Sequence, residues 1–201
     1  MARWEPDARG RLEKAAMELF QKRGYAQTTV EHIAAHAGLT ERTFFRYFSD
    51  KREVLFSGSK ELEKAIIERI EAAPREASPL DVVVGAFEVA GAELMARRDL
   101  TFVRARYALV TKHAEIQERE LIKLASLAVA VTRALHARGV AEPSASLAAE
   151  AGIAVFKIGF ERWLSARKPH DFAAHVREAA GALQALTAGS KAQAKALPKH
   201  R

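Results

Sequence analysis

Residues 28–51, "TTVEHIAAHAGLTERTFFRYFSDK", decide the fold, because two short helical patterns meet there at a glycine. Thr28 followed by Glu31 matches a capping box, which predicts that a helix starts at this point. Apolar residues then recur at helical spacing until Gly38, where the pattern stops. They define the inner face of the predicted helix: Val30, Ile33, Ala34 and Ala37.

The second pattern begins directly after the glycine. Gly38 permits a left-handed turn, Leu39 can fill the corner, and Thr40 is a favourable N-cap for another short helix. Phe44 and Phe48 are four residues apart and share one face, so we expect both rings in the core. Two short helices joined in this way are typical of a helix-turn-helix, whose second helix enters the major groove of DNA.

The outward face of this second helix carries cations and hydroxyl groups. Arg42 and Arg46 are four residues apart and form a basic stripe suited to guanine edges or phosphates. Tyr47 and Lys51, at the end of the short helix and the start of the next, are suited to phosphate oxygens. The ring of Phe45 is ambiguous: it could belong to the core, or contact a thymine methyl group or the sugar wall.

The rest of the chain shows period 3.6 almost throughout and no convincing strand, so we expect an all-α protein with about nine helices. A first helix should end at Gly24, and a long helix should run from about residue 51 to 73. A linker around residues 74–79 should follow. The later helices are expected at 80–97, 100–110, 115–139, 144–167 and 172–187.

Short helices crowd the first fifty residues and longer ones follow, which predicts two domains and a tail. We expect a helix-turn-helix DNA-binding domain at 1–50 and a larger helical domain at 51–188. The net charge is +7, but the last thirteen residues hold four Lys/Arg and no acidic residue. Residues 189–201 are therefore expected to form a disordered basic tail, which could also contact DNA non-specifically.

Composition excludes several classes of site. The chain has no cysteine, which rules out disulfides, thiolate metal sites and thiol nucleophiles and suits a reducing cytoplasm. The first ten residues lack the apolar core of a signal peptide, and no stretch approaches the roughly 18 apolar residues of a membrane span. We therefore expect a cytoplasmic protein that does not associate with a membrane.

No enzyme signature stands out in the sequence. We find no P-loop, no G-x-S-x-G and no dinucleotide fingerprint. His32 and His36 have the i, i+4 spacing of a zinc-binding helix, but the glutamate of HExxH is missing and no third ligand is evident. We predict that the chain is not an enzyme, that both histidines lie on the surface, and that it holds no metal and no cofactor.

The segment "LFQKRGYAQTTVEHIAAHAGLTERTFFRYFSDKREVLF" resembles the DNA-binding domain of the TetR family of bacterial transcriptional repressors. The resemblance covers residues 11–56 continuously. It implies a phosphate contact from Thr28 or Thr29 at the start of the second helix. Glu41 departs from the family pattern, because a carboxylate near phosphates is costly unless it accepts from a cytosine amine or pairs with Arg42. The implied DNA-facing positions are Thr40, Arg42, Thr43, Phe45, Arg46, Tyr47 and Lys51.

The resemblance also implies an arrangement for residues 57–188. The last two helices, 144–167 and 172–187, would pack against their equivalents in a homodimer, and a ligand cavity would lie among helices four to eight. A twofold dimer would place two recognition helices about 34–36 Å apart on a palindromic double-stranded operator. Small residues that would permit close helix approach at the dimer interface are Ala148, Ala149, Gly152, Ala173, Ala180 and Gly181.

A ligand cavity would need apolar walls and some polar groups. Each candidate also has the plainer interpretation of an ordinary core or surface residue. Arg104 and Arg106 could hold an anionic headgroup, such as that of an acyl thioester, or could instead bridge to glutamates. The candidate lining residues are Phe87, Leu94, Phe102, Arg104, Arg106, Tyr107, His113, Phe156, Phe160 and Trp163.

These patterns together predict a ligand-responsive DNA-binding regulator. We expect a repressor that leaves its palindromic operator when a small hydrophobic molecule binds the C-terminal domain. The alternative is a DNA-binding activator or architectural protein that responds to no ligand.

Overall fold

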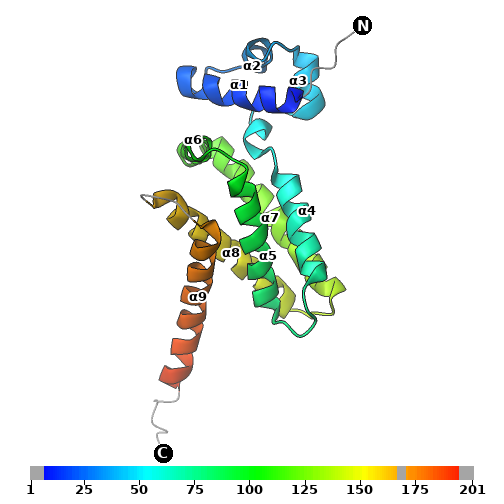
Figure 1. Ribbon diagram of the computed structural model, residues 1–201, viewed down its shortest axis with the longest axis vertical. Coiled ribbons are helices and arrows are strands. Elements are labelled where there is room, and N and C mark those ends of the chain that lie inside the picture. Colours follow the sequence, from blue (N-terminus) through cyan, green and yellow to red (C-terminus); the bar gives the residue numbers. More distant parts are fainter. Residues whose placement is uncertain (1–6, 167–170, 195–201) are drawn as a thin grey trace, which may run out of the picture. The chain divides into compact units, whose positions relative to one another are not determined.

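The computed structural model describes residues 7–166 and 171–194, with side chains through residue 188, and over this part it is all-α (Figure 1). The expected fold class is confirmed. The described elements are α1 (Ala8–Arg23), α2 (Val30–His36), α3 (Glu41–Tyr47), the 3-10 helix η1 (Glu53–Phe56), α4 (Ser59–Ala72), α5 (Pro79–Ala96), α6 (Leu100–Lys112), α7 (Ala114–Ala137), α8 (Ser144–Ser165) and α9 (Phe172–Ala194).

The chain forms two compact units, and each unit combines two separate stretches of the sequence. The first unit contains the described residues up to Lys60 together with 98–123, so α6 and the start of α7 belong to it. The second unit contains 61–97 and the described residues from Leu124 onward. Each unit has its own apolar core.

The predicted helix-turn-helix is present in the first unit. α1 ends at Gly24, which has φ +83°, and the turn after α2 contains Gly38 at φ +66°. The amide of Leu39 donates to the carbonyl of Ala34 at 2.8 Å, which closes the turn. The hydroxyl oxygen of Thr40 accepts from the Thr43 amide at 3.2 Å, as expected of an N-cap.

The predicted capping box at Thr28 and Glu31 is wrong by one residue. Thr29 caps α2: its hydroxyl oxygen accepts from the His32 amide at 3.1 Å, and the His32 ring nitrogen accepts from the Thr29 amide at 3.3 Å. Thr28 is fully buried, and its hydroxyl donates to the carbonyl of Gly24 at 2.8 Å. Because two threonines are adjacent, either could have been the N-cap of α2. Thr28 is buried in the bend after α1, so Thr29 is the cap.

The prediction of one long helix over residues 51–73 is also wrong, because the structure has two helices there, η1 and α4. The break lies at Ser57 and Gly58, and Gly58 has φ +92°, which a helix does not permit. Before η1 the Asp50 carboxylate accepts from the Arg52 and Glu53 amides at 2.7 and 3.2 Å.

The prediction of a disordered tail is wrong for residues 189–194. α9 continues to Ala194, so residues 189–194 are helical, and residues 195–201 lie outside the described part. No helix of the described residues is long and apolar enough to cross a membrane.

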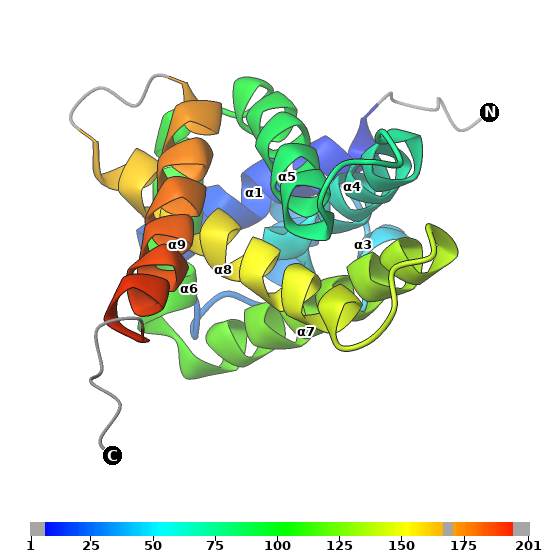
Figure 2. The ribbon, with the colours of Figure 1, turned by 90° about the horizontal axis from the view of Figure 1, so that it is seen from below.

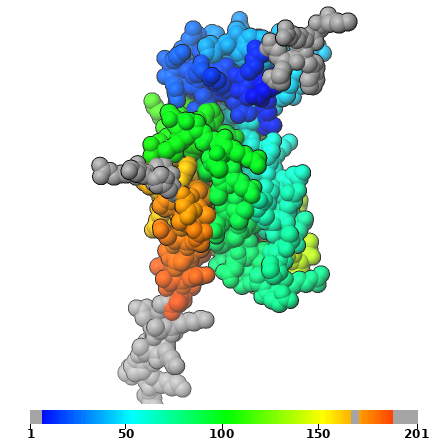
Figure 3. Space-filling model, in the orientation of Figure 1, coloured from blue at the N-terminus to red at the C-terminus, as the bar shows by residue number. Residues whose placement is uncertain are grey.

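In the second unit α8 lies beside both α5 and α9 (Figure 2). The surface of α9, orange in the space-filling view, lies directly against that of α5 (Figure 3). Glycines permit the close approach. A Cβ atom on Gly152 would lie 2.3 Å from Val83 of α5, and one on Gly159 would lie 2.9 Å from the Cα of Val176 of α9.

The small residues assigned to the dimer interface are therefore partly misplaced. Ala148, Ala149 and Gly152 are buried in the core of their own chain, where Gly152 meets α5. Their small size serves packing within the protomer. The exposed apolar residues of α8 are larger and include Leu147 and Ile158. On α9, Ala173 and Ala180 are half-buried and Gly181 is exposed.

Candidate nucleic-acid interface

α3 is fixed in place by its buried aromatic side. Phe44 and Phe48 have exposed fractions of 0% and 4%, and their ring centroids lie 5.5 Å apart. They belong to the same core cluster as Phe20, Ile33 and Leu55. Because this side of α3 is locked, its other side keeps a fixed orientation toward solvent.

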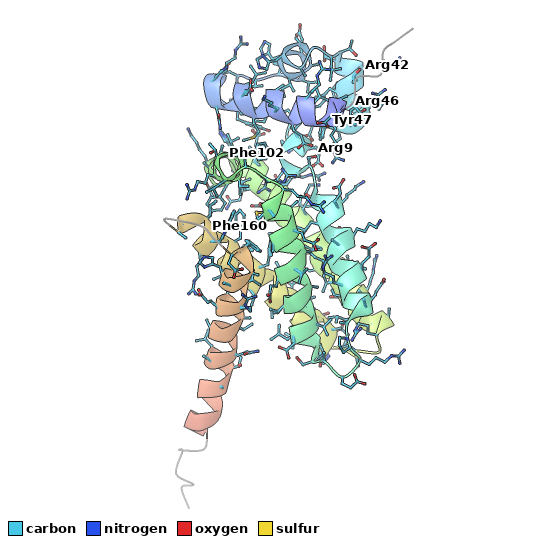
Figure 4. All side chains as sticks on the ribbon, viewed as in Figure 1. Arg9, Arg42, Arg46, Tyr47, Phe102 and Phe160 are labelled. Carbon is cyan, nitrogen blue, oxygen red and sulfur yellow. The ribbon has the colours of Figure 1, made fainter. Side chains whose placement is uncertain are left out.

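The outward side of α3 presents a compact basic and aromatic surface. Arg42, Arg46 and Tyr47 are exposed and come from the same short helix (Figure 4). The guanidinium of Arg46 donates to the Tyr47 hydroxyl at 3.1 Å and stacks over its ring at 4.9 Å. This contact holds both side chains together and leaves further guanidinium donors available for an acceptor outside the chain.

Thr40, Thr43 and Phe45 complete the predicted DNA-facing set on this helix. The hydroxyls of Thr40 and Thr43 lie 3.0 Å apart, with Thr40 exposed and Thr43 half-buried. Phe45 is not a core residue, since 53% of its surface is exposed. Its ring meets the edge of Phe44 at a centroid distance of 5.6 Å.

The remaining predicted contacts differ in accessibility. Thr29, the cap of α2, is exposed, whereas Thr28 is buried and already hydrogen-bonded. The half-buried Lys51 donates to the carbonyls of Tyr25 and Thr28 at 2.8 and 3.0 Å. The lysine therefore fastens the segment before α2, a role that its spacing in the sequence did not reveal.

The two histidines of α2 have partners within the fold. His32 completes the cap with Thr29, and the ring of His36 lies 2.8 Å from the carboxylate of Glu18 on α1. The hydrogen bond from His36 lowers the pKa of Glu18 below its usual value. Within the described residues no group of three possible metal ligands comes together.

Tyr25 is buried and packs against Phe20 of α1 and against His113, the residue after α6. Its side chain is 1% exposed, its ring centroid lies 5.0 Å from that of Phe20 and 5.1 Å from that of His113, and the Lys51 ammonium lies 4.2 Å from it. Burial raises the pKa of the Tyr25 hydroxyl, which has no hydrogen-bond partner among the described residues.

η1 is held to α6 and α7 by ionic contacts inside the first unit. Arg106 donates to the carbonyl of Leu55 at 2.7 Å and to the carboxylate of Glu120 at 3.0 Å. Glu53 pairs with Arg119 and with Lys123. Burial alone would raise the pKa of Glu53, but these two hydrogen-bonded cations outweigh burial and hold that pKa below its usual range.

The residues predicted to line a ligand cavity are divided between the two units. Phe102, Arg104, Arg106, Tyr107 and His113 belong to the first unit, and Phe87, Leu94, Phe156, Phe160 and Trp163 belong to the second. Of the two open alternatives for Arg106, the described contacts match the bridge to a glutamate. Arg104 is exposed.

In the second unit the aromatic candidates form a continuous cluster. Phe87 and Phe156 lie 5.1 Å apart, and Phe160 lies 6.1 Å from Trp163. Phe172 of α9 joins them, at 5.8 Å from Phe156 and 5.6 Å from Trp163. Phe172 was missed from the sequence, although its period with Val176 and Ala179 marks the inner face of that helix.

Among the described residues, surface pockets lie elsewhere. One, of about 390 Å³, lies in the first unit beside Arg11, Lys14 and Glu18. The other, of about 330 Å³, lies in the second unit between the end of α4 and the start of α5, beside Arg69 and Val89. Neither includes a residue of the predicted lining set.

Comparison with known proteins locates the first unit's helix-turn-helix in a family. Residues 12–57 match the model of bacterial regulatory proteins of the tetR family. TcmR, an HTH-type transcriptional regulator of Streptomyces glaucescens, is 39% identical over 79 residues, which are 39% of this chain and 35% of TcmR. The fatty acid metabolism regulator protein of Bacillus subtilis is 40% identical over 57 residues, or 28% of this chain and 29% of that protein.

The fold extends beyond this matched segment. The crystal structure of Thermus thermophilus FadR, a TetR-family transcriptional repressor in complex with lauroyl-CoA, superposes with a TM-score of 0.53 at 24% identity. The superposition covers 88% of this chain and 93% of that one. The similarity in sequence is concentrated in the helix-turn-helix, and the similarity over the remaining helices is one of fold.

Proposed function

We propose, from the membership of this chain in the TetR family of bacterial transcriptional regulators, that it is a repressor of one palindromic operator released by a small hydrophobic molecule. In this proposal residues 1–50 bind DNA, and residues 51–188 bind the effector and form a homodimer through the last two helices. The family is one of regulators and not of enzymes.

The observation that carries the proposal is the two-sided build of α3. Phe44 and Phe48 are buried, while Arg42, Arg46 and Tyr47 are exposed on a helix of only seven residues. A major groove about 12 Å wide admits such a helix, and arginine side chains recognise the O6 and N7 acceptors of guanine. We assign Arg42 and Arg46 to base edges or phosphates, and Thr29, Thr40 and Tyr47 to phosphates.

The ligand response is supported by the relatives and by the contacts of η1. FadR binds lauroyl-CoA, and one of the sequence relatives regulates fatty acid metabolism. In this chain Arg106, Arg119 and Lys123 hold η1, which directly follows the helix-turn-helix. A molecule that displaced α6 or the start of α7 would therefore disturb the segment that supports α3.

Selection of bound duplexes from a random pool tests the DNA-binding proposal. We expect one enriched palindrome whose half-site centres lie about one helical turn apart, 10–10.5 base pairs, as a twofold dimer requires. Arg46→Ala should enrich a less restricted half-site, and Arg75→Ala, a change at an exposed arginine before α5, should enrich the original one. A pool that stays random with the wild-type chain would contradict the proposal.

The repressor and the ligand-independent alternative differ in their response to an effector. We expect lauroyl-CoA, used as the probe, to weaken operator binding about 100-fold, because a shift of the DNA-binding state from 99% to 1% of the dimers lowers the apparent affinity by that factor and needs about 5.5 kcal/mol of differential binding. Coenzyme A without the acyl chain is the matched control. Operator binding that ignores lauroyl-CoA and a panel of other apolar molecules would favour an activator or architectural role.

A further inference from the structure

Phe45 is exposed in a part of the molecule that buries most of its large apolar side chains. Among the described residues of the helix-turn-helix and η1, the large hydrophobic side chains classed as exposed are Phe45, at 53%, and Tyr47, at 37%. Both lie on α3. The neighbouring rings of Phe44 and Phe48 are 0% and 4% exposed, so this part of the chain packs against an apolar core. The ring of Phe45 lies outside that core.

The ring of Phe45 has a fixed support. It packs edge-on against Phe44 at a centroid distance of 5.6 Å and an interplanar angle of 84°. Phe44 is fully buried and belongs to the core of the first unit. Phe45 is therefore a positioned apolar group at the surface, and half of its area is available to a partner.

Phe45 lies between two exposed arginines of α3, which the proposed function places against DNA. Arg42 precedes Phe45 by three residues and Arg46 follows it directly, and all three are exposed. Residues three apart lie on one side of a helix and are separated by about 4.5 Å along its axis. An arginine on this side can read guanine, but a phenyl ring can neither donate to nor accept from a base edge.

The major groove offers one apolar feature for such a ring, the C5-methyl group of thymine. We infer that Phe45 reads a thymine in the operator through this methyl group, within about two base pairs of the base pair that Arg42 contacts. The inference rests on the proposed function, because it assigns a base to a residue of the same interface.

Replacing single thymines by deoxyuridine tests the inference, since this removes the methyl group and leaves the base pair intact. The probe is the duplex selected from the random pool, with each thymine replaced in turn, titrated with the dimer. For the wild-type chain we expect one thymine in each half-site at which the replacement weakens binding about fourfold, the effect of one buried methyl group.

Phe45→Ala should remove this difference, so that thymine and deoxyuridine duplexes bind it equally. Arg46→Ala is the matched control: it should bind more weakly yet keep the fourfold ratio. Because each ratio compares two duplexes on one protein, a partial loss of folding in a variant cancels. Thermal unfolding of Phe45→Ala, followed by circular dichroism, checks that the helices remain.

Three results would overturn the inference. Deoxyuridine could be tolerated at every position by the wild-type chain, or the sensitive position could remain sensitive in Phe45→Ala. Alternatively, Phe45→Ala could weaken all duplexes equally, which would place the ring against the sugar wall. In each of these cases a palindrome has been selected and the proposed function stands, whereas a pool without enrichment overturns both.

Discussion

At the scale of single residues, the side chains around α3 divide into those that face solvent and those that hold the surface in place. Lys51 is the clearest case of the second kind, because its ammonium donates to the carbonyls of Tyr25 and Thr28. The sequence predicted a phosphate contact for this lysine from its position after α3. Within the fold its contacts also connect the segment between α3 and η1 to the segment before α2.

Lys51→Ala should therefore destabilise the chain. Hydrogen bonds to charged groups contribute about 1.5–3 kcal/mol, so we expect the free energy of unfolding to fall by an amount in that range. Urea unfolding measures the change, and Lys60→Ala, at an exposed lysine of α4, is the control. Unchanged stability combined with weaker binding to every duplex would show that the ammonium serves DNA phosphates alone.

For Tyr25, removal of a buried polar atom should not lower the free energy of unfolding, in contrast to Lys51→Ala. Its ring packs against Phe20 and His113, but its buried hydroxyl has no partner among the described residues. Tyr25→Phe keeps the ring and removes the unpaired group, so we expect unfolding free energy to stay equal or to rise by up to about 1 kcal/mol. Tyr25→Ala should cost about 3–5 kcal/mol. A clear loss on Tyr25→Phe would mean that the hydroxyl is hydrogen-bonded.

The spacing of residues in the sequence predicted which side chains of α3 face outward. It did not predict which atoms the side chains around α3 contact. The i, i+4 relation of Phe44 and Phe48 placed both in the core and left Arg42 and Arg46 outside, as the structure has them. The periodicity of a helix does not say whether a threonine caps the helix or is buried before it. It also does not identify the carbonyls that receive a long lysine side chain.

At the scale of elements, glycines decide where helices break and where they touch. Gly24 and Gly38 were predictable breaks, because each follows an amphipathic run. Gly58 was missed, because the apolar pattern continues across it and one glycine inside a helical pattern is tolerated. Its positive φ separates η1 from α4.

Two glycines inside helices should respond to alanine in opposite directions. On Gly159 a Cβ would lie 2.9 Å from the Cα and 3.1 Å from the backbone nitrogen of Val176, atoms that cannot rotate away. Gly159→Ala should therefore lower the unfolding free energy by about 1–3 kcal/mol. Gly85 of α5 has no neighbour within 4 Å of the added atom, so Gly85→Ala should raise it by about 0.5–1 kcal/mol.

Thermal and urea unfolding of both variants measure the contrast between these sites. Equal responses at the two positions would contradict the described packing of α8 on α9. The sequence showed that both residues lie in helices, but the neighbour of each glycine depends on how distant segments pack.

At the scale of the whole molecule, the proposed homodimer should use the exposed apolar residues of α8 and α9. Ile158 and Leu147 are 47% and 65% exposed on α8, and Leu186 is 76% exposed on α9. Ile158→Lys should place a charge in that interface and raise the dimer dissociation constant at least about tenfold, since an unpaired buried charge is costly. Sedimentation velocity across a concentration series measures it.

Val129→Lys is the matched control, because Val129 is 51% exposed on α7, outside the proposed interface. A dimer that dissociates with Val129→Lys and persists with Ile158→Lys would move the interface to α7. The sequence predicted this interface from small residues. The structure buries three of them within the protomer, because side-chain size alone does not distinguish contact with a partner from contact with a neighbouring helix.

The central claim is that the outward side of α3 reads DNA sequence, and fluorescence anisotropy of Arg46→Ala on the selected operator and on a scrambled duplex tests it most directly. We predict a loss of about 1–3 kcal/mol on the operator, a smaller loss on the scrambled duplex, and relaxed preference at one base position. Equal affinities of wild type and Arg46→Ala on both duplexes, with preference unchanged, would contradict it.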